Sequence, residues 1–232
     1  MKYTRYDLKR KNSDGIMFVA VLVGILVLAF FIGSIVSQIV YKNNKSVSKD
    51  YIAPENKQQP AVNTGTVNFI AIQGGIYNVK ETADATKNTL TEYGNPFLIV
   101  EQGKGTRVLL GIFTEEEAVK KLKELTDKNV ANYKLSFQLD GKTLCHQEII
   151  GIVDGNLQVL SRLTDKSVKS VNIVKLKEYC TQLKEVDKNS EHYSELSEMK
   201  NYIKGLPSDI TKEKASENYV FIYNILKKVT AK

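Results

Sequence analysis

The sequence predicts an α+β protein with one N-terminal transmembrane helix, and three observations lead to this fold class. The segment from Gly15 to Tyr41 contains no charged residue. The pattern Gly75–Glu81 returns 36 residues later as Gly111–Glu117. After residue 140, the apolar residues follow helical periodicity alone. Together these features predict a transmembrane helix, a βαββαβ unit and a C-terminal antiparallel helical bundle.

The N-terminal segment is long enough to cross a membrane. Residues Ile16–Ser37 are almost wholly apolar, and as a helix they would span about 33 Å. A cleaved signal peptide is the alternative, but its apolar core is only about 7–15 residues long and ends at a small-residue cleavage site. Five basic residues precede the segment and three lysines follow it closely, which favours a cytoplasmic N-terminus. We therefore expect a cytoplasmic tail over 1–14, a transmembrane helix over 15–41, and extracytoplasmic domains beyond.

Charge and residue usage exclude several function classes. The net charge of +7 is divided between the N-terminal tail and a diffuse excess elsewhere, so it forms no nucleic-acid footprint. The two histidines, His146 and His192, lie far apart in the sequence without a supporting ligand pattern, so no metal site or cofactor is predicted. No Ser/His/Asp or Cys/His set is recognisable, so no catalytic residue is assigned and the protein is not expected to be an enzyme.

The two cysteines are predicted to be free thiols. Cys145 and Cys180 fall on the predicted extracytoplasmic side, where disulfides are permitted. In an antiparallel helical hairpin the two cysteines would be offset along the helix axis by about five residues, which corresponds to about 8 Å. That offset exceeds comfortable disulfide geometry.

A polar linker and a duplicated βαββαβ unit follow the predicted membrane segment. The linker, over 42–65, is rich in Lys, Asn, Gln, Ser and Pro and is predicted to be flexible. Two capping boxes, Asn78 with Glu81 and Thr114 with Glu117, predict helix starts. The strands are expected at Val67–Gln73, Phe97–Glu101, Thr106–Phe113 and Asn132–Leu139. The unit is predicted to form a four-stranded antiparallel sheet with both helices on one face.

Strand alternation assigns side chains to the two faces of this sheet. The set expected beneath the helices is Ile70, Ile72, Val108, Leu110 and Ile112. The set expected on the opposite, open face is Phe69, Gln73, Arg107 and Leu109. An amide, a guanidinium and an aromatic ring on one open face favour a sugar-binding or peptide-binding site.

Residues 141–232 are predicted to form a helical domain. Four apolar stripes at helical spacing support this prediction: Ile149, Val153, Leu157 and Leu160; Ile173, Leu176, Cys180 and Leu183; Leu196, Met199 and Ile203; and Ala215, Tyr219, Ile222, Leu226 and Val229. The heptad spacing of the second stripe would suit a partner helix from another protein. Packing within the bundle is the favoured interpretation.

The duplicated unit resembles a known family. The runs Ile72–Tyr77 and Thr106–Phe113, the pair Glu117-Ala118 and the 36-residue repeat are similar to the SPOR domain, the sporulation-related repeat. The resemblance covers about residues 66–139 and is assigned to a domain over 66–140. It implies an extracytoplasmic module that binds septal peptidoglycan, preferring glycan strands stripped of stem peptides. Such modules commonly belong to single-pass membrane proteins of cell division or sporulation.

The resemblance also implies residue roles. The family's strand-one glutamine falls on Gln73 and its strand-three arginine on Arg107, so these two would contact glycan beside Phe69 and Leu109. The chain departs from the family pattern at Ile76, where a serine is common, and at Gly105, where an aromatic residue is common. Two hypotheses result. The favoured hypothesis is a membrane-anchored protein that binds septal glycan strands in cell division or sporulation. The alternative is a membrane-tethered protein-interaction scaffold with a degenerate SPOR fold.

Overall fold

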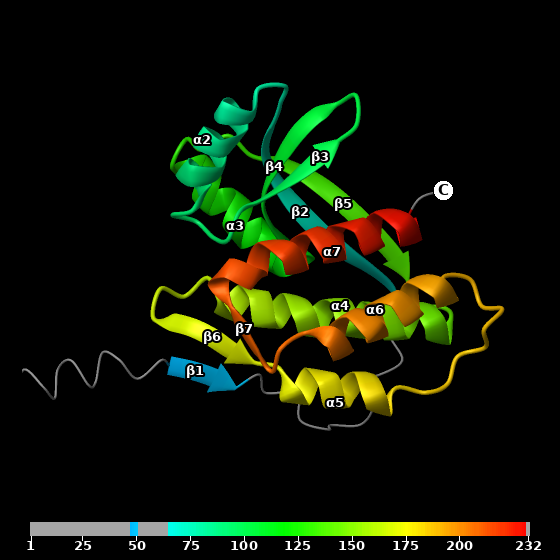
Figure 1. Cartoon of the computed structure of the whole chain (residues 1–232). Helices are drawn as coiled ribbons and strands as arrows, with labels where there is room; N and C mark the ends of the chain where they lie inside the picture. Colours follow the sequence, from blue (N-terminus) through cyan, green and yellow to red (C-terminus); the bar gives the residue numbers. More distant parts are fainter. Residues whose placement is uncertain (1–46, 51–64, 231–232) are drawn as a thin grey trace, which may run out of the picture. The chain divides into compact units, whose positions relative to one another are not determined.

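The computed structural model describes residues 47–50 and 65–230, and they belong to one compact unit (Figure 1). The predicted cytoplasmic tail, transmembrane helix and most of the linker lie outside the described residues. Among the helices that are described, none combines the length and the apolar character that a membrane crossing needs. The elements are β1 Val47–Asp50, β2 Thr66–Tyr77, α2 Lys80–Leu90, β3 Phe97–Glu101, β4 Gly105–Thr114, α3 Glu115–Asp127, β5 Tyr133–Asp140, α4 Leu144–Arg162, β6 Val168–Asn172, α5 Val174–Gln182, α6 Tyr193–Gly205, β7 Asp209–Thr211 and α7 Lys212–Thr230.

The predicted four-stranded antiparallel sheet is present. Its strands lie in the order β3-β4-β2-β5, and every neighbouring pair is antiparallel. Helices α2 and α3 lie together on one side of it (Figure 1). Beneath them is a core that includes Ile70, Ile72, Val108 and Leu110, as strand alternation predicts.

The prediction for Ile112 is wrong because β4 contains a bulge. Ile72 pairs with Gly111, whereas Gln73 pairs with Leu109, so Leu110 has no partner in β2. One extra residue reverses the alternation of side chains beyond it. Ile112 therefore packs in the core on the second face, away from α2 and α3.

One of the two predicted capping boxes forms. At α3, the Thr114 side chain accepts a hydrogen bond from the Glu117 backbone N–H, and the Glu117 carboxylate accepts one from the Thr114 backbone N–H. At α2 the N-cap is Val79, with no side-chain cap. Strand β2 extends to Tyr77, so the helix begins one residue later than predicted and Asn78 is out of the capping position.

The hairpin between β3 and β4 requires glycine at Gly105. Its φ is +91°, which lies in the left-handed region that favours glycine. A Cβ at this position would also lie 2.7 Å from the Tyr77 carbonyl oxygen and 2.8 Å from the Asn78 Oδ1. Backbone geometry therefore explains why this chain has no aromatic side chain here.

The C-terminal half contains the four predicted helices, but it is not a purely helical bundle. Strands β6 and β7 form a small three-stranded sheet with β1, in the order β1-β6-β7. Strand β1 is parallel to β6 and comes from the stretch predicted to be a flexible linker. Both β6 and β7 are short, and their partners are distant in sequence, so local periodicity does not reveal them.

The boundary predicted at residue 140 does not separate two cores. Helices α4 and α7 contact the second face of the four-stranded sheet, and in Figure 1 α7 lies on the side away from α2 and α3. One core contains Phe69 and Leu109 from the sheet together with Ile149 and Leu226 from the helices. The physical reason is that the sheet is apolar on both faces, so both must be covered.

Candidate functional site

The four residues predicted to bind glycan do share one face of the sheet. Gln73 and Leu109 are paired across β2 and β4, and the Arg107 Nη1 donates a hydrogen bond to the Gln73 Oε1. Phe69 and Leu109 belong to the core on this same face. Strand alternation thus identified which side chains lie together.

The prediction that this face is open is wrong. Phe69 and Leu109 are 1% and 0% exposed. Helix α7 contributes Tyr219, whose ring stacks on Phe97 with centroids 5.1 Å apart. It also contributes Tyr223, whose ring meets Phe137 edge-on at 5.5 Å. The aromatic surface expected to support a sugar ring is the core between the sheet and α7.

The polar part of the face is a hydrogen-bonded cluster that joins the sheet to α7. The Arg107 Nη2 lies 2.9 Å from the Glu101 Oε2, and the two side chains are 13% and 10% exposed. The Glu101 Oε1 accepts long hydrogen bonds, both of 3.4 Å, from the Tyr223 hydroxyl and the Lys227 ammonium. The hydrogen bond from Arg107 lowers the pKa of Glu101, although burial opposes this shift. We call Gln73, Glu101, Arg107, Tyr223 and Lys227 the polar cluster.

Sequence reasoning missed three members of the polar cluster. Glu101 looks like an ordinary strand-end carboxylate, and Tyr223 and Lys227 are separated from it by 122 and 126 positions. The signal that could have indicated a covered face is the apolar run in β2, where Phe69, Ile70, Ala71 and Ile72 follow one another. Continuous apolar runs are typical of strands buried on both faces.

The edge of the polar cluster keeps some accessible surface. Ile76 is paired with Arg107 across the strands, and Tyr133 is paired with Gln73. Both Ile76 and Tyr133 are exposed. The Arg107 Nε is buried without a hydrogen-bond partner among the described residues. This rim therefore offers two apolar surfaces beside a mostly buried guanidinium, which is a small fraction of the predicted site.

A separate cleft is lined by α2, the α2–β3 connection, α3, the α4–β6 connection and the start of α7. Basic side chains line it (Lys87, Lys121, Lys166 and Lys212) together with Tyr93 and Asn95. The Lys212 ammonium donates to the Asp165 carbonyl, and Lys121 pairs with Glu124. Two of these charges are therefore engaged within the chain, and none of the residues predicted to bind glycan lies here.

Comparison of the chain with protein-family models, with curated proteins and with solved structures finds no match. The SPOR resemblance therefore rests on the sequence motifs and is not supported by an independent match.

Proposed function

We propose that the protein is a membrane-anchored, extracytoplasmic interaction scaffold built on a degenerate SPOR-like fold. In this proposal the N-terminal segment holds the chain in the cell membrane with its N-terminus in the cytoplasm, and the unit containing the two sheets binds a partner protein. The observation that carries the proposal is the closure of the predicted glycan face by the chain's own α7.

The energetics of α7 favour a permanently covered face. Withdrawing the helix would expose buried side chains that include Tyr219, Ile222, Tyr223 and Leu226. Burial of a large apolar side chain contributes about 1.5–3 kcal/mol, so these four alone contribute roughly 6–12 kcal/mol. A hydrogen bond to a sugar contributes about 1–3 kcal/mol at a charged group. Several such hydrogen bonds would be needed to offset the free energy lost when α7 is withdrawn.

The edges of the four-stranded sheet supply surfaces suited to a protein partner. Strands β3 and β5 are the two edges, and within the described part of the chain each is paired on one side only. Strand β5 has eight residues, which is enough for an added strand to form several backbone hydrogen bonds. Its exposed positions include Tyr133, Ser136 and Gln138.

Photo-crosslinking in living cells tests the scaffold directly. A photoreactive residue placed at Tyr133 or Gln138, on the β5 edge, is expected to give a discrete protein adduct. The matched control is Lys120, an exposed position on α3, which is expected to give none. Equal labelling at all three positions, or no adduct at the β5 positions, would contradict the proposal.

Glycan binding is the second candidate, favoured by the exposed side chains of Ile76 and Tyr133, which are paired with Arg107 and Gln73 across the strands. A pulldown of the full chain in detergent with amidase-treated sacculi distinguishes the two functions. The scaffold proposal expects the wild type to remain in the supernatant. Binding by the wild type that is lost in both Gln73→Ala and Arg107→Ala would instead support septal glycan recognition at this rim, in division or sporulation.

A further inference from the structure

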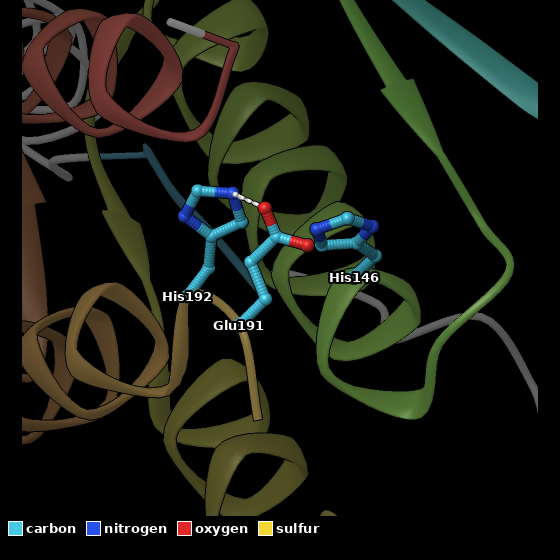
Figure 2. A group of neighbouring side chains, drawn as sticks. All are labelled: His146, Glu191 and His192. Carbon is cyan, nitrogen blue, oxygen red and sulfur yellow. Dashed lines mark ion pairs between the residues drawn. The ribbon is translucent and has the colours of Figure 1, made fainter. Parts of the chain in front are cut away.

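The fold brings the only two histidines of the chain into contact. His146 lies in the first turn of α4, and His192 is the residue before α6. Their rings are stacked with centroids 5.3 Å apart and planes inclined by 29°. Figure 2 shows the Glu191 carboxylate beside the two rings, with one oxygen toward each of them. One potential ligand atom from each of the three residues lies within 4.8 Å of the others.

His146 is held in the orientation that a metal ligand requires. Its Nδ1 lies 2.7 Å from the Asp140 Oδ1, and this hydrogen bond lowers the pKa of Asp140. The side chain is 12% exposed, and its Nε2 is buried with no hydrogen-bond partner in the described structure. Histidine ligands commonly bind a metal with one ring nitrogen while a carboxylate holds the other. A buried polar nitrogen without a partner is costly unless something binds it.

His192 has a carboxylate near each ring nitrogen, but without a short hydrogen bond like that of His146. Its Nε2 lies 3.6 Å from the Glu191 Oε1, and its Nδ1 lies 3.7 Å from the Glu195 Oε2. Both separations exceed ordinary hydrogen-bond lengths. Each histidine thus has one nitrogen near an outer carboxylate, Asp140 or Glu195, and the His192 Nε2 lies on the side of Glu191.

We propose that His146, Glu191 and His192 bind one Zn²⁺ ion through the two Nε2 atoms and the Glu191 carboxylate. Two imidazoles and one carboxylate form a ligand set that zinc uses when a fourth position is left for water. Mg²⁺ and Ca²⁺ prefer oxygen ligands, so this set disfavours them. Asp140 acts as a positioning residue that orients the His146 ring through its hydrogen bond to Nδ1.

Binding requires only a small contraction of the cluster. Zinc–ligand bonds of about 2.0–2.2 Å in tetrahedral geometry place ligand atoms roughly 3.3–3.6 Å apart. The Glu191 side chain is 76% exposed, so its carboxylate has the freedom to close this gap. The ion would connect the start of α4 to the end of the α5–α6 connection, over 183–192. Zinc is therefore expected to slow hydrogen exchange in that connection.

The test is a zinc titration of the full chain in detergent, purified without a polyhistidine tag and stripped with a chelator. Competition with a chromophoric chelator is expected to give one Zn²⁺ per chain, and Mg²⁺ is expected not to compete. Co²⁺ should give the intense visible bands of a four-coordinate site. His146→Ala and His192→Ala should each weaken zinc binding at least 100-fold. Asp140→Asn should weaken it about 10–100-fold, as is usual for residues that orient a ligand.

Matched variants keep the test decisive. Glu191→Gln changes an exposed side chain and is expected to fold normally and to weaken binding. Glu116→Gln, an exposed carboxylate on α3, should bind as the wild type does, and so should Cys145→Ser. The proposal is wrong if the wild type binds no stoichiometric zinc. It is also wrong if Glu191→Gln and both histidine variants bind zinc as tightly as the wild type.

Discussion

Individual residues under α7 have properties that the fold imposes on them. Glu101 is the centre of the polar cluster, because it accepts hydrogen bonds from Arg107, Tyr223 and Lys227. The two largest influences on the pKa of Glu101 oppose each other. The hydrogen bond from Arg107 favours the charged carboxylate, and burial disfavours it. The pKa of Glu101 is lowered, so the ion pair prevails and Glu101 is charged in the folded protein at neutral pH.

Replacement of Glu101 by Gln should destabilise the fold by about 1–3 kcal/mol, because Arg107 then loses its charged partner in a poorly solvated site. The folded-state pKa lies below the unfolded value. The stabilisation is therefore present above about pH 4.5 and is lost as the pH falls through the folded pKa. Urea unfolding of wild type and variant between pH 3 and pH 7 should show their difference shrinking at the acid end. Glu116→Gln, at an exposed ion pair, should leave the free energy of unfolding essentially unchanged, because solvent screens such pairs.

The two cysteines should be unreactive in the native protein. Both are free and buried, as the sequence predicts, and burial raises the pKa of Cys145 and of Cys180 to about 11. Because the thiolate is the reactive species, Ellman's reagent at pH 8 should detect almost no thiol in the folded chain. It should detect two thiols in guanidinium without reductant. A thiol count of zero after unfolding would instead reveal a disulfide.

At the scale of elements, the two repeats differ in how their helices begin. Thr114→Ala should lower stability by about 1 kcal/mol, within the usual range of about 0.5–2 kcal/mol for a lost N-cap. Asn78→Ala should change it by less than about 0.5 kcal/mol, since Asn78 makes no cap in the structure. Thermal unfolding of both variants measures the difference between the two losses of stability. Equal losses would mean that Asn78 caps α2 after all.

At the scale of the whole molecule, the sheet and the C-terminal helices depend on each other. A chain that ends at Asp140 would expose Phe69, Phe97, Leu109 and Phe137, all of them buried in the shared core. It should therefore lose its cooperative unfolding transition and its near-UV circular dichroism, whereas the full chain should unfold in one step. A cooperatively folded 1–140 fragment would show that the sheet is an independent domain and that α7 is a removable cover.

Much of the secondary structure followed from local sequence. The βαββαβ order, the antiparallel sheet and the four C-terminal helices are determined by alternation, helical stripes and turn residues, which act over a few positions. The same alternation correctly grouped Gln73, Arg107, Phe69 and Leu109 on one face. It failed at Ile112, because a bulge reverses the side-chain order without a local signal.

What covers each face was decided by tertiary structure alone. The periodicity of α7 shows that it has an apolar side, but not that this side packs on Phe97 and Phe137 instead of on neighbouring helices. The same limit hid the approach of His146 to His192, which lie 46 positions apart. Local patterns specify which surfaces must be buried, because water disfavours apolar area wherever it lies. The choice of partner surface depends on how distant elements fit together, and only the folded chain determines that fit.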